Sequence, residues 1–246
     1  MKKTVIIIPT RLGAKRFPNK PLAKINNLPM IVHVFERAKD SNVGEVLVAT
    51  PDHEIVDVIS ENGGKAILTS GNHSSGSDRV YEAYLKVYKN QKDNVDLIIN
   101  LQGDMPNINS SAIKNLEKLM RNNNCDIGTL ASTIKDKNEI LDPNIVKIET
   151  DEDLKENKFL LAKDFFRIKK HLKNEKIYHH IGIYAFTSVA LTKYVKLTRS
   201  GLEIERNLEQ MRAIENEMKI KVALSNTAPL GVDTKEDFKK VIKEMN

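Results

Sequence analysis

Residues 4–9 read Thr-Val-Ile-Ile-Ile-Pro and are followed directly by Thr-Arg-Leu-Gly-Ala-Lys-Arg-Phe-Pro-Asn-Lys-Pro-Leu at residues 10–22. The first stretch is apolar and β-branched at most positions, which is typical of a strand covered on both faces of a parallel sheet. Pro9 closes this stretch, and the segment after it is polar and basic. We therefore expect a central strand whose carboxyl end opens into a basic loop.

The segments after this strand alternate between helical and extended patterns. Apolar residues at 31, 34, 35 and 38 have helical spacing, and the spacing returns at 80, 83, 84 and 87. Strands are indicated at 46–50, 65–69 and 97–101, and a further helix at 54–61, before Gly63 and Gly64. This alternation predicts an α/β fold, a three-layer nucleotidyltransferase-like or Rossmann-like domain with a mostly parallel sheet.

The pattern changes in the second half of the chain. Extended segments predominate at 127–134, 145–149, 159–161 and 180–186. We expect a smaller β-rich subdomain of mixed or antiparallel strands at approximately residues 127–200, inserted within a single domain that covers residues 1–246. Helical spacing then predicts a helix over 202–217, which would place Glu205, Glu209 and Arg212 on one face. A strand at 220–224, a loop at 229–233 and a final helix from Lys235 follow.

Composition limits the classes of protein to be considered. The chain has 246 residues, 40% of them hydrophobic, and can bury a substantial core. Its formal charge of +6, from 39 Lys and Arg against 33 Asp and Glu, suits anionic small molecules and does not by itself indicate nucleic acid. The single cysteine, Cys125, cannot form an intramolecular disulfide, which fits a reducing compartment. Since no apolar stretch reaches ~18 residues, we expect no membrane insertion and a cytoplasmic location.

The basic loop is the first place where chemistry is expected, because open α/β sheets bind ligands beyond the carboxyl ends of their strands. Arg11, Lys15, Arg16 and Lys20 lie within ten residues. Guanidinium groups bind phosphate oxygens in bidentate fashion, and lysine adds a compact charge. The loop is neither a Walker A nor a dinucleotide-binding motif, since Gly13 is its only glycine. It is also compatible with a solvated basic loop that binds nothing.

Two aspartates follow predicted strands and are candidate metal ligands. Asp104 comes after the strand at 97–101, and Asp233 lies in the loop after the last strand. Mg²⁺ in proteins typically takes one or two carboxylates together with phosphate oxygens and water. Either residue can instead be a turn or helix-capping residue, and Asp233 is a plausible N-cap of the final helix.

A third candidate is the loop of small and polar residues that precedes the helix around Val80. It reads His-Ser-Ser-Gly-Ser-Asp-Arg at residues 73–79. Its backbone amides and hydroxyls can bind a base or a phosphate at the start of the helix. The alternative is that Ser77 or Asp78 simply caps this helix.

These candidates belong to longer segments that follow one another along the chain. The segments are PTRLGAKRFPNKPL (9–22), PMIVHVFERA (29–38), VATPD (48–52), GNHSSGSDRV (71–80), INLQGDMP (99–106), YHHIGIYAF (178–186), LEQMRAIE (208–215) and PLGVDTKED (229–237). Taken together they resemble the 3-deoxy-manno-octulosonate cytidylyltransferase family, also called CMP-Kdo synthetase. The resemblance covers nearly the whole chain.

The resemblance implies that the chain transfers CMP from CTP to 3-deoxy-manno-octulosonate (Kdo), giving CMP-Kdo and pyrophosphate for lipopolysaccharide biosynthesis. It also implies Mg²⁺ as cofactor, a homodimer, and a role in sugar binding and dimerisation for the β-rich subdomain. The implied catalytic residues are Arg11, Arg16, Lys20, Asp104 and Asp233, of which Asp104 and Asp233 hold the metal. The expected nucleotide-binding residues are Pro9, Thr10, Arg11, Arg16, Lys20, Ser75, Gly76, Arg79, Gln102 and Asp104. The expected sugar-binding residues are Gln102, His180, Tyr184, Glu209 and Gln210.

Two positions depart from the family pattern. Met105 stands where the family often has a glutamate, and Lys163 stands where it usually has an arginine. Since lysine lacks the bidentate geometry of arginine, the acceptor sugar is less determined than the nucleotide chemistry. An amino-substituted Kdo, or a nonulosonic acid such as sialate, stays open as the acceptor. A non-catalytic nucleic-acid-binding protein is a further alternative, although the 5% aromatic content offers few stacking platforms.

Overall fold

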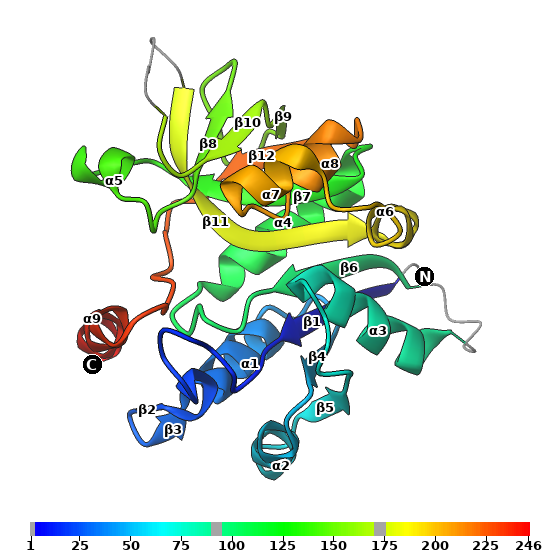
Figure 1. Cartoon of the computed structure of the whole chain (residues 1–246), viewed down its shortest axis with the longest axis vertical. Coiled ribbons are helices and arrows are strands. Elements are labelled where there is room, and N and C mark those ends of the chain that lie inside the picture. The colour runs from blue at the N-terminus through cyan, green and yellow to red at the C-terminus, as the bar shows by residue number, and fades with distance from the viewer. Residues whose placement is uncertain (1–2, 90–94, 170–175) are drawn as a thin grey trace. The chain divides into compact units, whose positions relative to one another are not determined.

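The computed structural model describes residues 3–89, 95–169 and 176–246, and Figure 1 labels its helices and strands. The chain divides into two units. The first unit consists of Met1–Lys114 and Pro229–Asn246, and the second consists of Asn115–Ala228. No helix among the described residues is long and apolar enough to cross a membrane.

The first unit is built on a parallel sheet whose strands follow the order β5-β4-β1-β6. The strands are β1 (Lys3–Pro9), β4 (Glu45–Thr50), β5 (Lys65–Leu68) and β6 (Val95–Leu101). In the register, Ile7 faces Leu47 of β4 on one side and Asn100 of β6 on the other. The prediction of a central, doubly covered first strand is confirmed, because every residue of β1 after Lys3 is buried. The strand order reverses between β1 and β6, where doubly wound folds bind their ligands.

Helices connect these strands as the sequence predicts. Helix α1 (Met30–Asp40) and helix α2 (His53–Glu61) pack on β4 and β5, whereas α3 (Gly76–Tyr88) packs on β1 (Figure 1). Connections between parallel strands are right-handed, so connections that run in opposite directions along the sheet place their helices on opposite faces. The sheet and the helices on its two faces are the three layers. Helix α2 ends before Gly63, whose φ of 71° lies in the left-handed region that favours glycine.

The basic loop and the end of the chain share one apolar cluster in the first unit. The loop contains a short 3-10 helix, η1 (Lys20–Leu22), and a small hairpin of β2 (Lys24–Ile25) and β3 (Leu28–Pro29) that the sequence did not indicate. Helix α9 (Lys235–Met245) packs Val241 against Ile25, and the Phe238 ring meets the Phe17 ring edge-on, with centroids 5.4 Å apart. The last helix therefore stabilises the loop that follows β1.

The second unit has a mixed sheet with the strand order β11-β7-β12-β9, while β8 pairs with β11 and β10 pairs with β8. The strands are β7 (Ile127–Ser132), β8 (Lys147–Thr150), β9 (Leu160–Leu161), β10 (Asp164–Phe166), β11 (Lys176–Thr187) and β12 (Ile220–Leu224). The pair of β7 and β12 is parallel, and the other described pairs within this unit are antiparallel. Helix α4 (Ser110–Asn122) contains the boundary between the units, and α5 (Asn138–Leu141) and α6 (Ser188–Tyr194) complete the described helices that precede residue 200.

The prediction of one helix over residues 202–217 is wrong. The segment forms two short helices, α7 (Gly201–Arg206) and α8 (Met211–Glu215). Asn207 ends α7 in the left-handed conformation, with φ 51° and ψ 47°. Between the helices, the Tyr194 hydroxyl donates to the carbonyl oxygen of Glu209 at 2.7 Å, which holds the chain in its non-helical path. Glu205, Glu209 and Arg212 therefore do not share a helix face.

A buried ion pair explains why the chain turns between α7 and α8. The Arg212 guanidinium donates to both carboxylate oxygens of Glu203, at 2.7 and 2.8 Å, and both side chains are 3% exposed. Arg212 also lies over the Tyr194 ring, 4.9 Å from its centroid. A single straight helix would place residues 203 and 212 on different sides, since nine residues span two and a half turns. The pair thus requires the break.

Candidate active site

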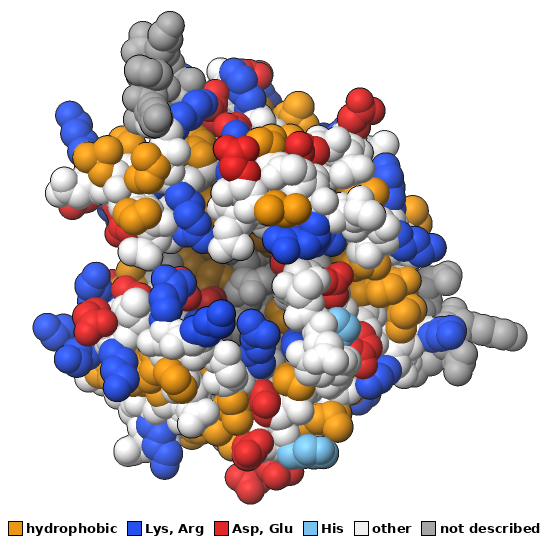
Figure 2. Space-filling view, in the orientation of Figure 1, with side chains coloured by type: hydrophobic (Ala, Val, Ile, Leu, Met, Phe, Trp, Pro, Cys, Tyr) orange, Lys and Arg blue, Asp and Glu red, His pale blue; other side chains and the backbone are white. Residues whose placement is uncertain are grey.

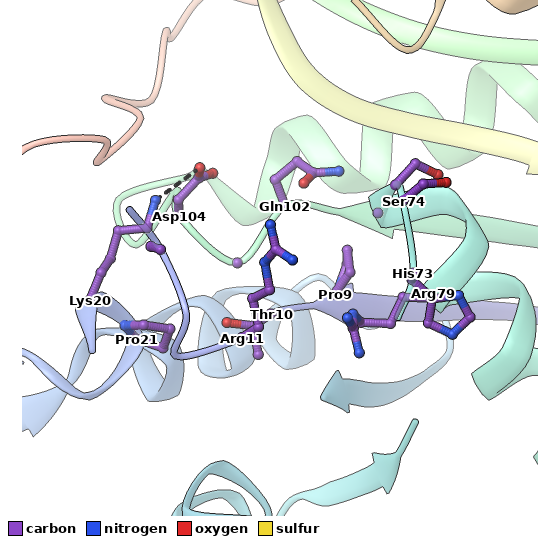
Figure 3. A pocket seen from close by; sticks show the side chains of 14 residues that line it. Pro9, Thr10, Arg11, Lys20, Pro21, His73, Ser74, Arg79, Gln102 and Asp104 are labelled. Atoms are coloured by element: carbon purple, nitrogen blue, oxygen red, sulfur yellow. Dashed lines mark hydrogen bonds and ion pairs between the residues drawn. The ribbon is translucent and has the colours of Figure 1, made fainter. Parts of the chain in front are cut away.

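A pocket of about 320 Å³ lies at the carboxyl ends of β1 and β6 in the first unit (Figure 3). Its lining comes from three segments: Pro9, Thr10, Arg11, Ala14, Lys20 and Pro21; His73, Ser74, Ser75, Gly76 and Arg79; and Gln102, Gly103 and Asp104. This is the point where the strand order reverses, and the volume suits a small-molecule ligand. Nine of the ten predicted nucleotide-binding residues line the pocket, and the tenth, Arg16, lies outside the lining.

The pocket has two ends with different chemistry. At one end Lys20 and Asp104 face each other, and at the other end lie His73, Ser74 and Arg79 (Figure 3). Arg11 and Gln102 lie between the two ends. An elongated ligand that carries charge at one end and hydrogen-bonding groups at the other matches this arrangement.

The close approach of two strand ends depends on a glycine. A Cβ atom added to Gly103 would lie 3.0 Å from the carbonyl oxygen of Pro9 and 3.1 Å from Cβ of Thr10, closer than ordinary packing allows. Behind the pocket, Gln102 donates to Asn100 at 3.0 Å, and Asn100 donates to the Ser77 hydroxyl at 3.3 Å. These hydrogen bonds tie the exit of β6 to the first turn of α3.

Four predicted catalytic residues come together at the charged end of the pocket. Lys20 Nζ lies 3.4 Å from an Asp104 oxygen and 3.7 Å from an Asp233 oxygen. Arg16 binds the other Asp233 oxygen at 2.8 Å. Lys20 also donates to the carbonyl oxygen of Val232. Burial raises the pKa of Asp104 and the Asp233 charge adds to this rise, whereas Lys20 opposes it.

The helix-capping alternatives for two candidates are wrong. Helix α9 is capped by Thr234, whose hydroxyl accepts from the Asp237 amide at 3.2 Å, so Asp233 is not used as a cap. Helix α3 is capped by Ser75, whose hydroxyl accepts from the Asp78 amide at 3.2 Å, rather than by Ser77 or Asp78. The Asp233 carboxylate is therefore left to the charged cluster.

The donor set fits a magnesium ion bound jointly with phosphate. Among the described residues, no group of three or more His, Cys, Asp or Glu side chains could hold a metal by itself. The carboxylates of Asp104 and Asp233, however, lie close to one position, which the Lys20 ammonium group occupies in this structure. Mg²⁺ needs only one or two carboxylates when phosphate oxygens and water complete its coordination.

The opposite end of the pocket contains a buried guanidinium group. Arg79 is 4% exposed and donates from Nη1 to the Thr69 hydroxyl at 2.6 Å and to the Ser70 carbonyl at 2.9 Å. Burial lowers the pKa of Arg79, and the nearby charge of Arg11 lowers it further. The nearby carboxylates of Asp52 and Glu82 act in the opposite direction, so the positive charge of the two arginines is partly offset at this end of the pocket.

The predicted sugar-binding residues are distributed over both units. Gln102 lines the pocket, whereas His180, Tyr184, Glu209 and Gln210 belong to the second unit. The His180 and Tyr184 rings lie 5.3 Å apart, which confirms that they share one side of β11. Burial lowers the pKa of His180 to about 3, so its ring is neutral, and its Nε2 lies 3.0 Å from the Thr129 hydroxyl. Gln210 is buried, and Glu209 is half-buried.

The two departures from the family pattern have different surroundings. Met105 is buried in the core of the first unit. Lys163 is 55% exposed and forms ion pairs with Asp151 at 3.1 Å and Glu149 at 3.4 Å. In this structure the Lys163 ammonium is thus engaged by carboxylates of its own unit.

Several lining residues were not predicted as site residues. Ala14, Pro21, His73, Ser74 and Gly103 line the pocket in addition to the expected set. His73 and Ser74 lie in the segment at 71–80, and their position next to Ser75 is the feature of the sequence that indicates them as lining residues. On the face drawn in Figure 2, Lys and Arg side chains are interspersed with Asp and Glu side chains.

Comparisons with known proteins show the family of the chain. The cytidylyltransferase family model matches residues 5–220. Among curated proteins, 3-deoxy-manno-octulosonate cytidylyltransferases of Bartonella tribocorum (44% identical, 97% of each chain) and Brucella canis (43%, 96% of this chain and 93% of the relative) are similar. A solved CMP:2-keto-3-deoxy-manno-octonic acid synthetase complexed with CTP has a TM-score of 0.88 and 34% identity, with 99% of this chain and 98% of that chain covered.

More distant structures share the fold alone. A cytidylyltransferase from Leptospira borgpetersenii has a TM-score of 0.63 at 20% identity, covering 98% of this chain and 86% of that one. The family model and the similar relatives show that the chain is a nucleotidyltransferase, an enzyme with an α/β fold. Within that class, the chain belongs to the 3-deoxy-manno-octulosonate cytidylyltransferase family.

Proposed function

We propose that this enzyme transfers CMP from CTP to Kdo and releases pyrophosphate. The observation that carries the proposal is the pocket at the switch point of the sheet, whose lining includes Arg11, Lys20 and Asp104. A nucleoside triphosphate is an elongated ligand with one highly charged end. Its phosphates belong at the Lys20 and Asp104 end, and its nucleoside belongs at the His73 and Arg79 end.

In the reaction, the anomeric hydroxyl of the sugar attacks the α-phosphorus of CTP. A new oxygen–phosphorus bond forms, the bond between the α-phosphorus and the oxygen bridging to the β-phosphate breaks so that pyrophosphate leaves, and the hydroxyl proton passes to water. Both substrates are anions, so positive charge around the phosphorus is the main catalytic requirement. Arg11, Arg16 and Lys20 supply it by binding phosphate oxygens.

Asp104 and Asp233 are the residues that would hold Mg²⁺. The ion supplies charge neutralisation to the phosphates when it is bound. Lys20 and Arg16 already lie beside these carboxylates, at 3.4 and 2.8 Å, and add further positive charge at the same end. The carboxylates in turn hold Lys20 at this end of the pocket, and Asp233 pairs with Arg16 outside the lining.

On the sugar side, we assign Gln102, His180, Tyr184, Glu209 and Gln210 to the binding of Kdo. The β-rich subdomain at approximately 127–200 provides sugar binding and dimerisation, and the enzyme acts as a homodimer in the cytoplasm. Its product is the activated sugar for lipopolysaccharide biosynthesis. The neutral His180 ring and the Tyr184 hydroxyl suit a polyhydroxylated ligand, because both can donate and accept hydrogen bonds.

The decisive experiment measures pyrophosphate release for each common nucleoside triphosphate paired with Kdo, 8-amino-Kdo and sialate, with and without Mg²⁺. We expect turnover with CTP, Kdo and Mg²⁺ together. A clear preference for 8-amino-Kdo or sialate would assign a different acceptor, which the departure at Lys163 leaves open. Turnover that prefers UTP or ATP, or no turnover with any pair, would refute the proposal.

A further inference from the structure

Side chains of helix α3 form hydrogen bonds with both backbone polar groups of Ser70, in the segment after β5. The Ser70 amide donates to the Glu82 carboxylate, at 2.9 Å to one oxygen and 3.2 Å to the other, and the Ser70 carbonyl accepts from Arg79 at 2.9 Å. Lys86 donates to the Leu68 carbonyl at 2.8 Å. Arg79, Glu82 and Lys86 lie at positions i, i+3 and i+7, on one face of the helix. The segment that leads into the pocket is therefore fixed by three side chains.

Glu82 also contacts His73, a lining residue of the pocket. His73 Nε2 lies within hydrogen-bond distance of the Glu82 carboxylate, and Lys86 binds the same carboxylate at 2.8 Å. Burial opposes ionisation, but the hydrogen bonds from Lys86, His73 and Ser70 together lower the pKa of Glu82 to about 2. An ionised carboxylate can only accept hydrogen bonds, so the His73 ring must carry a proton on Nε2.

The other ring nitrogen has no protein partner. Among the described residues, none makes a hydrogen bond to Nδ1 of His73, although the ring is only 19% exposed. His73 lines the pocket, whereas Glu82 does not. With Nε2–H donated to Glu82, the ring in its neutral form offers Nδ1 as a hydrogen-bond acceptor to the pocket. Arg79, beside it in Figure 3, can only donate.

We propose that Glu82 is a positioning residue that fixes His73 in the Nε2–H tautomer, and that Nδ1 of His73 accepts a hydrogen bond from an N–H or O–H group of the bound nucleoside. The inference rests on the proposed function, which places the nucleoside at this end of the pocket. His73 is then a contact residue for the nucleotide. Glu82 does not contact the nucleotide and acts on its binding only through His73 and the Ser70 segment.

The first test is steady-state pyrophosphate release by the full chain with CTP and Kdo, comparing wild type, His73→Leu, Glu82→Gln and the double variant. We expect each single change to raise the KM for CTP roughly tenfold, the scale of one hydrogen bond involving a charged group. The KM for Kdo and kcat should change by less than about threefold. The double variant should be little worse than either single variant, because the two residues act as one unit.

Glu36→Gln is the matched control, because Glu36 forms an exposed helical pair with Lys39 at 3.7 Å on α1 and should leave every constant unchanged. An unchanged KM for CTP in His73→Leu, or fully additive effects in the double variant, would overturn the proposal. A second measurement does not depend on activity: the ¹⁵N chemical shifts of the His73 ring should report a protonated Nε2 in wild type. A proton on Nδ1 of the neutral ring would also overturn it.

Nucleotide analogues identify the donor. The effect of His73→Leu on binding, measured by calorimetry, should vanish with UTP if the cytosine amino group is the donor, and with 2′-deoxy-CTP or 3′-deoxy-CTP if a ribose hydroxyl is. An effect that persists with all three analogues contradicts a nucleoside donor. These binding measurements also separate the two proposals, since absent turnover with every sugar would refute the proposed function, while unchanged CTP binding in His73→Leu would refute only the role of His73.

Discussion

Replacing Arg212 with leucine removes one partner of the buried ion pair between α7 and α8. Glu203 would keep two contacts, from Arg199 Nε at 3.2 Å and from the Ser200 amide at 3.3 Å, and the side chain of Arg199 is half exposed. Breaking a buried pair typically costs about 3–5 kcal/mol, because a carboxylate is left unpaired in the interior. Since Arg199 partly compensates, we expect the free energy of unfolding of Arg212→Leu to fall by about 3 kcal/mol.

Urea unfolding followed by circular dichroism measures this loss. Its matched control is the double variant Glu203→Met, Arg212→Leu, which leaves no unpaired charge in the interior, since Arg199 is half exposed, and should lie within about 1 kcal/mol of wild type or be more stable. A surface comparison is Lys158→Met, whose ion pair with Glu152 at 3.0 Å is mostly exposed and should contribute less than about 1 kcal/mol. A loss below about 1 kcal/mol for Arg212→Leu, or a double variant as unstable as the single one, would refute the reasoning.

Three other outcomes are expected. Asp104→Asn should remain folded but lose roughly two orders of magnitude in kcat, as expected for one preorganised electrostatic group, and near-normal pyrophosphate release would exclude its role as a metal ligand. Lys20→Ala and Arg16→Ala should each weaken CTP binding more than Kdo binding in calorimetry. The effect should be larger at Lys20, because its side chain is 13% exposed whereas that of Arg16 is 55% exposed. Unchanged CTP affinity in both variants would show that the loop is merely solvated. Because the folded pKa of His180, about 3, lies below the ordinary value, the neutral ring contributes its full stability above pH ~6.5 and loses it as pH falls toward 3, at up to about 1.4 kcal/mol per pH unit. In urea unfolding measured against pH, His180→Asn should lack this part of the pH dependence. Identical pH dependence in wild type and variant would contradict the buried neutral ring.

The first unit could be predicted from the sequence because local patterns decide it. The apolar stretch in β1, the helical spacing in α1 and the glycine after α2 each agree with the structure. The helix at 202–217 could not be predicted correctly, since its apolar spacing continues through the break. What interrupts it is the buried contact of Arg212 with Glu203, and a contact across a turn leaves no periodic signal in the sequence.

The candidate site shows the same division. Asp104 and the basic loop were found because both follow strands whose carboxyl ends meet at one edge of the sheet. Asp233 was found from its place after the last strand and from the family resemblance, but its pairing with Arg16 depends on the return of the chain end to the first unit. The link between His73 and Glu82 joins a loop to the second turn of a helix, and neither residue type has a spacing that indicates it.

The contact between Lys20 and the Val232 carbonyl joins residues that are 212 positions apart. Val232 and Val241 also pack in the apolar cluster that contains Ile25, so residues near the end of the chain hold the segment that follows β1. During translation, the basic loop therefore leaves the ribosome long before the residues that hold it in place. A chain that stops before residue 229 contains all of the pocket lining yet lacks Asp233 and the acceptor for Lys20, so under the proposed function we expect it to bind a nucleotide poorly.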